Sequence, residues 1–327
     1  MRFAIYGAGG VGGYFGGRLA QAGEDVTFIA RGMHLEAIKD RGLWVESING
    51  DFHISMAMAF DRPEKVGVVD VVLVATKAWQ VAEAAQQMKP LIGPQTMVVP
   101  LLNGVSAPDE LSAALGREHI LGGMCRLSVF IGGPGLIKHV GIQPYIAFGE
   151  RDGAQSERVE RLRAVFARCQ GLTVDVPADI EATMWDKFIF IAAISGVGAV
   201  TRQPLGGFRA LPESRALLLA ALEETTAVAR ARGVRLPADQ VQKTLAFIDN
   251  AAPGLVASMQ KDVLEGKPSE LEAQNGAVLR MGRELGVPTP IHGFIYASLL
   301  PGELKAREAA KITNRKSKIV NPKSETP

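Results

Sequence analysis

Residues 2–12 of the chain read RFAIYGAGGVG. The first five predict a short apolar strand, and the glycine-rich turn that follows fits the pattern G-x-G-x-x-G. Residues 11–22 then predict a helix, which Gly23 ends, and residues 26–30 predict a second strand. A strand, a glycine turn and a helix in this order are typical of the βαβ unit that binds a dinucleotide.

Each glycine of the turn has a separate role in such a site. Gly7 permits the tight turn, Gly9 lets the backbone approach a pyrophosphate, and Gly12 allows the helix to pack closely on the strand. The phosphates would meet free N–H groups at the positive end of the helix. A glycine-rich turn without a ligand is the alternative, and the flanking strand and helix disfavour it. The predicted cofactor contacts are therefore Gly7, Ala8, Gly9, Gly10, Val11 and Gly12.

The residue after the second strand predicts which nicotinamide cofactor is used. Enzymes that use NAD usually carry Asp or Glu there to bind the ribose 2′-hydroxyl, whereas Arg accommodates a 2′-phosphate. Here the strand VTFIA is followed by Arg31 and Gly32, with no acid. A planar guanidinium suits a phosphate, although a plain surface arginine is the alternative. We predict NADPH as the cofactor and Arg31 as its phosphate contact.

The rest of the first half alternates strands with helices, which predicts a mostly parallel, doubly wound sheet. Further strands are expected at residues 68–75 and 97–102, with a helix at 80–91 between them. After residue 120 the segments become short and are broken by glycines. There we expect an antiparallel meander on the edge of the sheet, then a helix and a last strand, at 124–131, 135–139, 145–148, 156–169 and 173–176.

From residue 179 onward nearly every segment has helical periodicity. Helices are expected at 179–201, 212–232, 238–249, 254–265, 269–285 and 290–299. The predicted fold class is α/β, with an N-terminal Rossmann-type doubly wound sheet and a C-terminal all-α domain.

The change near Pro177 from short predicted strands to helical periodicity suggests the domain boundary. We expect an NADP-binding domain at residues 1–177 and a helical domain for substrate binding and dimerisation at 178–305. Lys and Arg accumulate after Lys305 without interleaved aromatic residues, which favours a frayed, flexible basic tail at 306–327.

Composition restricts the function further. Apolar residues make up 47% of the chain and the formal net charge is +2, which argues against a dedicated nucleic-acid binder. Cys125 and Cys169 lie far apart without metal-ligand spacing, so we expect reduced thiols and no metal site. The apolar start leaves no room for a signal peptide, and the longest uncharged apolar run, 188–200, is short for a membrane span. We expect a cytoplasmic protein with no membrane partner; a homodimer is compatible with the sequence.

Polar residues end two further predicted strands, at the edge where ligands of such sheets bind. The strand at 68–75 leads into Thr76 and Lys77, and the strand at 97–102 leads into Asn103. Both residues have plain alternatives, because Lys77 could open a helix in solvent and Asn103 could belong to an ordinary Asn-Gly turn.

Three residues of the second half are also candidates. Lys187 has apolar neighbours three, four and seven positions away on its helix, so it must extend to solvent, find an anion or line a cleft. Ser269 and Glu272 form a predicted capping box, which leaves Glu270 without that structural role, although an acid near a helix N-terminus is itself favourable. Ser258 is locally an unremarkable helix residue.

Taken together, these residues resemble those of ketopantoate reductases (2-dehydropantoate 2-reductases). The resemblance implies a Rossmann domain joined to a helical domain, NADPH as cofactor, and reduction of ketopantoate to (R)-pantoate in the pantothenate pathway. It is carried by GAGGVGG at 7–13, TKAWQV at 76–81, LLNGV at 101–105, WDK at 185–187 and ASMQKDVLEGKPSELE at 257–272.

The resemblance also implies roles for the candidate residues. Lys187 would be the general acid beside the substrate carbonyl, and Asn103 would position the substrate near the nicotinamide, in contact with both. Glu270 and Ser258 would contact the substrate, and Lys77 would lie on the cofactor side. These roles agree with the chemistry, because hydride transfer to a ketone leaves negative charge on oxygen that a proton donor must meet.

The chain departs from the family pattern on one helix. The family commonly carries asparagines one and two turns after the lysine, where this chain has Ile191 and Ser195; a third falls near Leu205. Ser195 could keep one hydrogen bond to the substrate or be a small packing residue, whereas Ile191 can keep none. We therefore expect a more apolar substrate site than usual.

The sequence thus predicts NADPH-dependent reduction of a 2-oxo acid, with ketopantoate as the leading substrate. A dehydrogenase for a bulkier or more apolar 2-oxo acid is the first rival, and Ile191 and Ser195 favour it. A catalytically silent NADP-binding protein is the second. Retention of Lys187, Glu270 and Asn103 together argues against the silent protein.

Overall fold

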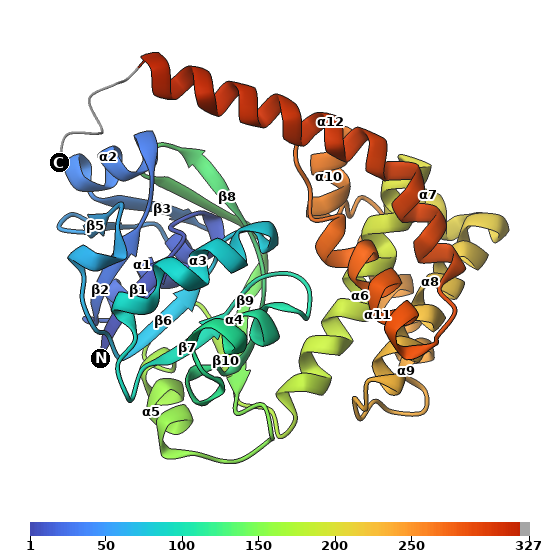
Figure 1. Cartoon of the computed structure of the whole chain (residues 1–327), viewed down its shortest axis with the longest axis horizontal. Coiled ribbons are helices and arrows are strands. Elements are labelled where there is room, and N and C mark those ends of the chain that lie inside the picture. The colour runs from blue at the N-terminus through green and yellow to red at the C-terminus, as the bar shows by residue number, and fades with distance from the viewer. Residues whose placement is uncertain (321–327) are drawn as a thin grey trace. The chain divides into compact units, whose positions relative to one another are not determined.

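The structure is a computed structural model that describes the backbone of residues 1–320 and the side chains of residues 1–312. The chain divides into two compact units, Met1–Met184 and Trp185–Pro327. The first unit is an α/β unit and the second is helical, so the predicted fold class is confirmed (Figure 1).

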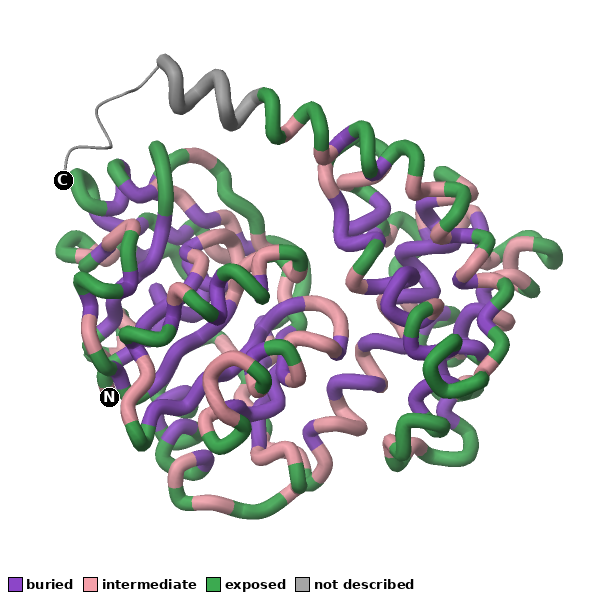
Figure 2. The backbone as a smooth tube through the Cα atoms, viewed as in Figure 1, coloured by how far each residue is buried: buried purple, intermediate pink, exposed green. Residues whose placement is uncertain are grey.

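The first unit is built on a five-stranded parallel sheet with the order β5-β2-β1-β6-β7. Its central strands are buried along almost their whole length, which explains their continuous apolar sequence (Figure 2). The strands are β1 (Arg2–Tyr6), β2 (Asp25–Ile29), β5 (Met58–Phe60), β6 (Val71–Val74) and β7 (Met97–Pro100).

Helix α1 (Gly10–Gln21) packs between two sheets and is therefore buried on opposite faces. A Cβ added at Gly16 would lie 2.7 Å from Ile5 of the first sheet, and one at Gly13 would lie 2.7 Å from Ile137 of the second. The many glycines of this helix thus permit close contact with a sheet on each side.

The second sheet corrects one prediction. The segment after residue 120 is antiparallel, as expected, but β8 and β9 do not extend the first sheet; they belong to a separate sheet that covers α1. The isolated bridge between Val98 and Ile120 links the first sheet to the chain just before β8. The second sheet has the order β10-β9-β3-β4 with β8 on β9, and its strands are β3 (Leu43–Ser47), β4 (Phe52–Ile54), β8 (Gly122–Gly133), β9 (Leu136–Gly149) and β10 (Thr173–Asp175).

Several elements of the first unit were not predicted from the sequence. They are the strands β3, β4 and β5 and the helices α2 and α4. The three strands are only three to five residues long, which is too short for a clear alternation of apolar and polar residues. Helices α3 and α4 pack on the face of the first sheet opposite α1. The helices of the unit are α2 (Gly32–Arg41), α3 (Val81–Gln87), α4 (Ala107–Leu115) and α5 (Glu157–Phe166).

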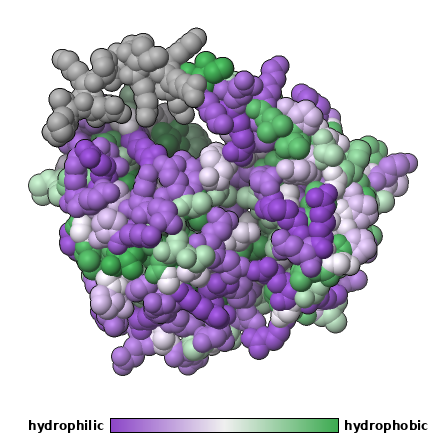
Figure 3. Space-filling model, in the orientation of Figure 1, coloured by the Kyte–Doolittle hydropathy of each residue, from purple (hydrophilic) through white to green (hydrophobic). Residues whose placement is uncertain are grey.

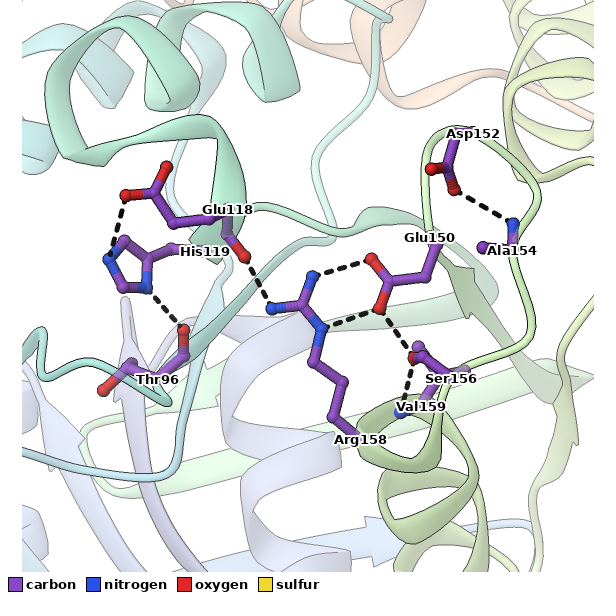
Figure 4. Close-up of polar contacts among 9 residues, drawn as sticks. All are labelled: Thr96, Glu118, His119, Glu150, Asp152, Ala154, Ser156, Arg158 and Val159. Atoms are coloured by element: carbon purple, nitrogen blue, oxygen red, sulfur yellow. Dashed lines mark hydrogen bonds and ion pairs between the residues drawn. The ribbon is translucent and has the colours of Figure 1, made fainter.

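A polar network holds the start of α5 (Figure 4). Arg158 binds both carboxylate oxygens of Glu150, at 2.7 Å each, and donates to the carbonyl of Glu118. Ser156 is the N-cap of the helix: its Oγ donates to Glu150 and accepts from the N–H of Val159. This network joins the end of β9 to the helix that follows.

The second unit surrounds α6 (Ile180–Thr201), which begins in the first unit and crosses the division between Met184 and Trp185. Within the described residues, α6 is the one helix long and apolar enough to span a membrane, and 67% of its most apolar window is buried in the protein, as in a core helix. On the face drawn in Figure 3, hydrophilic residues cover most of the described surface and apolar residues lie in small groups.

The remaining helices follow the predictions with four differences, the first of which is the short helix at Leu205–Ala210, where no helix was predicted. Helix α10 begins at Ser258, after Pro253 and Gly254 have ended the preceding helix, and not at residue 254. The predicted helix at 269–285 opens as a π-helical turn, η5 (Glu272–Gly276), before α11. The helices are α7 (Leu205–Ala210), α8 (Pro212–Ala231), α9 (Gln240–Asn250), α10 (Ser258–Leu264), α11 (Ala277–Leu285) and α12 (Pro290–Val320).

The fourth difference concerns the predicted tail from residue 306. Helix α12 continues through Pro301 to Val320, because the segment after Glu303 is rich in Ala, Glu, Lys and Arg, which favour helix. The end of the predicted tail, 321–327, lies outside the described residues.

Candidate cofactor and substrate sites

The glycine turn lies at the carboxyl edge of the first sheet, where the strand order reverses around β1. Ligands of doubly wound sheets bind at this switch point. Gly7 has a φ of 101°, and a Cβ there would lie 2.9 Å from the carbonyl oxygen of Ala75. A Cβ at Gly12 would lie 2.1 Å from the carbonyl oxygen of Gly7. The turn and the helix can therefore approach this closely only with glycine at both positions.

The start of α1 is suited to an anion. Gly9 is its N-cap, and no side chain caps the helix. The first N–H groups of a helix have no partner within the helix, and the helix dipole makes this end positive. A Cβ at Gly9 would meet nothing within 4 Å, so the backbone is open to an approaching group. These features fit a pyrophosphate at Gly9, Gly10 and Val11.

His34 fixes the turn from outside and was not predicted. Its Nδ1 accepts the N–H of Gly135 at 3.0 Å, so Nε2 carries the proton and donates to the carbonyl of Ala8 at 2.8 Å. Burial lowers the pKa of His34, which favours this neutral form. No sequence pattern points to His34, because Gly135 lies 101 residues further along the chain.

Arg31 stands at the end of β2, as the N-cap of α2, with 60% of its side chain exposed. Its Nη2 donates to Oε1 of Gln87 at 3.0 Å and lies 3.8 Å from a carboxylate oxygen of Glu83. The hydroxyl of Tyr6 donates to the same Gln87 oxygen at 2.6 Å. The guanidinium is thus anchored to α3 on one side while much of it remains accessible to an anion.

The other two strand ends bring Lys77 and Asn103 to the same edge. Tyr6 of β1 pairs in register with Val74 of β6, and Val74 pairs with Pro100 of β7, so the chain leaves these strands at one level. Lys77 is exposed and Asn103 is half-buried.

A further polar group lies beside the turn. The buried hydroxyl of Thr76 has no hydrogen-bond partner among the described residues, and its methyl carbon would lie 3.1 Å from a Cβ at Gly7. A buried hydroxyl without a partner costs free energy unless a ligand or water meets it. This orphaned group, next to the open turn, fits a site that holds a polar cofactor.

The two cysteines and the metal-ligating residue types are dispersed in the described part of the chain. Cys125 and Cys169 are both buried and form no disulfide with each other, and burial raises the pKa of the Cys169 thiol to about 11. Within residues 1–312 no three His, Cys, Asp or Glu side chains gather as a metal site.

In the second unit, α6 carries Lys187, Ile191 and Ser195 at intervals of four, so that they lie along one stripe of the helix. Lys187 and Ile191 are half-buried. Ser195 is fully buried, and its Oγ has no partner among the described residues. The stripe therefore changes from a charged group to an apolar side chain to a buried hydroxyl.

Glu270 lies in the turn before η5 and is only 4% exposed, whereas Ser258 is exposed as the first residue of α10. The predicted capping box is wrong. The N–H of Ser269 is bound by Glu303 of α12, and the carboxylate of Glu272 instead binds Arg280 and Tyr296. Ser269 does cap locally, because its Oγ accepts the N–H of Leu271 at 3.3 Å.

Shortly after Glu270 in the sequence, η5 is hydrogen-bonded to α6 and α12 through Asn275. The Nδ2 of Asn275 donates to the carbonyl of Ala192 at 3.1 Å and to Nδ1 of His292 at 3.0 Å. His292 is fully buried, and this burial lowers its pKa to about 4, so the imidazole is neutral. Both amide atoms of the fully buried Gln274 lack partners among the described residues. The second unit thus holds several unpaired polar groups close in sequence to Glu270.

Comparison with known proteins identifies both parts of the chain. Residues 3–153 match the family model described as ketopantoate reductase PanE/ApbA, and residues 179–302 match its C-terminal counterpart. A 2-dehydropantoate 2-reductase of Mesorhizobium japonicum is 32% identical over 318 residues, covering 91% of this chain and 96% of the relative. The uncharacterized oxidoreductase YkpB of Bacillus subtilis is 31% identical over 301 residues, covering 91% and 98%.

Solved structures agree in fold. The 2-dehydropantoate 2-reductase of Geobacter metallireducens GS-15 superposes with a TM-score of 0.85 at 32% identity, covering 92% of this chain and 99% of that one. A D-mandelate dehydrogenase, solved with NADH and anilino(oxo)acetate, shares the fold with a TM-score of 0.84 at 23% identity, covering 94% and 99%.

Proposed function

The chain belongs to the ketopantoate reductase family of oxidoreductases, and from this premise we propose that it uses NADPH to reduce a 2-oxo acid to a 2-hydroxy acid. Ketopantoate, giving (R)-pantoate for pantothenate synthesis, is the leading substrate. We propose the cytoplasm as the location and a homodimer as a candidate assembly.

The observation that carries the proposal is the open glycine turn at the switch point of the sheet, next to Arg31. The turn presents the start of α1, which no side chain caps, the Thr76 hydroxyl lacks a partner among the described residues, and Arg31 offers an accessible guanidinium at the end of the neighbouring strand. A dinucleotide with a 2′-phosphate would satisfy all three groups. Lys77 and Asn103, at the ends of β6 and β7, would complete the contacts on this edge.

When bound, the reduced nicotinamide supplies the hydride. The proposed role of Lys187 is to donate a proton to the ketone oxygen as negative charge develops there, a step in which a positioned acid contributes about 10²–10⁴-fold. Asn103 would hold the substrate carbonyl near the hydride donor. Ser258 offers a hydroxyl to the substrate, and Glu270 offers an acceptor for a substrate hydroxyl.

A more apolar 2-oxo acid is the second candidate substrate, and a specific observation favours it. Ile191 is half-buried on the stripe that continues from Lys187, and Ser195 is fully buried on the same stripe. Neither position offers the exposed amide that a hydroxylated substrate tail would use.

Purified protein assayed for NADPH oxidation against a panel of 2-oxo acids tests the proposal. The panel includes ketopantoate, branched-chain and aromatic 2-oxo acids, each with NADPH and with NADH. We expect turnover with NADPH on at least one member. Absence of turnover with every substrate, although NADPH binds, would instead support the silent NADP-binding protein.

A further inference from the structure

Ser269, the residue before Glu270, is held at both of its backbone groups by one ion pair of α12. Its N–H donates to both carboxylate oxygens of Glu303, at 3.1 and 3.0 Å, and its Oγ donates to the same carboxylate at 2.5 Å. Its carbonyl oxygen, which belongs to the peptide bond joining Ser269 to Glu270, accepts from Nη2 of Arg307 at 3.0 Å. Arg307 and Glu303 also bind each other at 2.6 Å.

Glu303 is 6% exposed, so this carboxylate is buried. A buried charge is costly unless it is paired and its hydrogen-bonding capacity is used, and here the guanidinium, an N–H and a hydroxyl all bind it. The arrangement is thus a complete polar network built around the backbone of one serine.

The backbone after Ser269 is tied as well. The N–H of Leu271 donates to the Ser269 Oγ, and the carbonyl of Glu270 accepts the N–H of Gln274 at 3.0 Å. Glu270 therefore leaves the backbone from a segment whose flanking peptide groups are fixed on both sides. Holding the backbone in this way fixes where the Glu270 side chain starts, so less conformational freedom is left to be lost when it binds a ligand.

We propose that Glu303 and Arg307 are positioning residues for Glu270, which they orient through the Ser269–Glu270 peptide. This inference rests on the proposed function, in which Glu270 contacts the substrate. The alternative is that the network only anchors α12 to the segment that precedes η5.

A double-mutant cycle distinguishes the positioning role from a purely anchoring role. Glu303→Gln keeps the size of the side chain but removes its charge, and Glu308→Gln, at an exposed glutamate on the same helix, is the matched control. We expect Glu303→Gln to lower kcat/KM for the best 2-oxo acid by about ten- to a hundredfold, because small displacements of a site residue have effects of this size. In a Glu270→Gln background the same change should alter kcat/KM by less than about threefold.

An equal loss in both backgrounds would overturn the proposal, because a purely structural role does not depend on Glu270. If Glu303→Gln does not fold, Ser269→Ala removes only the hydroxyl contacts and completes the same cycle.

Hydrogen exchange tests the positioning role independently of the proposed function. Exchange of the amides of residues 266–276 should accelerate in Glu303→Gln and not in Glu308→Gln. Unchanged exchange would overturn the positioning role whether or not the wild type reduces a 2-oxo acid. If the wild type is inactive on every 2-oxo acid and exchange is altered as expected, the proposed function is rejected, whereas the hold of Glu303 and Arg307 on the Ser269–Glu270 peptide is retained.

Discussion

Arg31 is the residue on which the proposed preference for NADPH depends. Arg31→Ala should weaken NADPH binding by about tenfold, the lower end for a charge-assisted contact, because the side chain is 60% exposed. NADH binding should stay nearly unchanged, since NADH has no 2′-phosphate. Both affinities can be measured by fluorescence titration, with Lys39→Ala, an exposed lysine of the same helix, as the control. Equal losses for the two cofactors would contradict the assignment.

Lys187 carries the proposed proton transfer. It is half-buried on α6, so truncation removes no fully buried contact, and Lys187→Ala should fold normally. We expect kcat to fall by about 10²–10⁴-fold on the best substrate. The control is Lys243→Ala, an exposed lysine on α9. Near-wild-type kcat in Lys187→Ala, measured under saturating substrate, would show that another group protonates the product.

Ile191 determines how well the site distinguishes a hydroxylated substrate. An apolar pocket discriminates weakly, so the wild type should separate ketopantoate from an analogue without the terminal hydroxyl by no more than about a hundredfold in kcat/KM. Ile191→Asn should move this ratio toward ketopantoate, and Ile191→Val should not. Thermal melting of both variants excludes misfolding, since a new amide on a half-buried face can destabilise. A wild-type ratio above about 10⁴ would mean that other residues read the hydroxyl.

At the scale of elements, α5 depends on the ion pair between Glu150 and Arg158. The Arg158 guanidinium beside Glu150 holds the pKa of that carboxyl below its ordinary value of 4.5. A carboxyl whose pKa is lowered on folding stabilises the folded state above its unfolded pKa, and this stabilisation is lost as the pH falls through the folded pKa. Glu150→Gln should therefore cost about 1–2 kcal/mol at pH 7 and progressively less below pH 4.5.

The measurement is the denaturant midpoint of the wild type and Glu150→Gln at pH 7 and at successively lower pH. Glu157→Gln, at an exposed glutamate in the first turn of α5, is the control and should change the midpoint little. A difference between Glu150→Gln and the wild type that persists undiminished to pH 3 would show that the packing of Glu150, and not its charge, stabilises the helix.

Sequence predicted elements well where local pattern and tertiary environment agree. The segment from β1 to β2 is an example, because its apolar strands are buried on both faces and its glycines are required by the turn. Sequence-based prediction failed where hydrogen-bonding partners lie far apart along the chain. Nothing near Ser269 shows that Glu303 will take its N–H, so the capping box with Glu272 was the natural but wrong prediction.

The candidate site shows the same division. The glycine turn, Arg31, Lys77 and Asn103 could be proposed from the sequence because each follows a strand by no more than three residues, and parallel strands end at one edge. His34 and Gln87 support this edge through side-chain contacts with residues far along the chain, which no local pattern records. No sequence pattern distinguishes Thr76, and its hydroxyl without a partner among the described residues appears only in the structure.

At the scale of the whole molecule, the division into two units allows us to predict which residues NADPH protects from amide exchange. A ligand that binds only the folded state stabilises it by about 2.7 kcal/mol at a concentration of 100 times its Kd. The proposed NADPH contacts lie at the carboxyl edge of the sheet in the first unit. NADPH should therefore slow amide exchange most strongly in residues 7–13, 30–34, 75–80 and 101–106, whereas α8 and α9 of the second unit should be little affected.

Hydrogen exchange with and without NADPH measures this distribution directly. Arg31→Ala at the same NADPH concentration is the internal comparison, and protection at the sheet edge should fall with its occupancy, because linkage depends on the ratio of ligand to Kd. Protection of α8 and α9 as strong as that of the glycine turn would contradict the prediction. It would mean that the cofactor contacts extend well beyond the sheet edge, and that Gly7, Gly9 and Arg31 do not account for most of the binding.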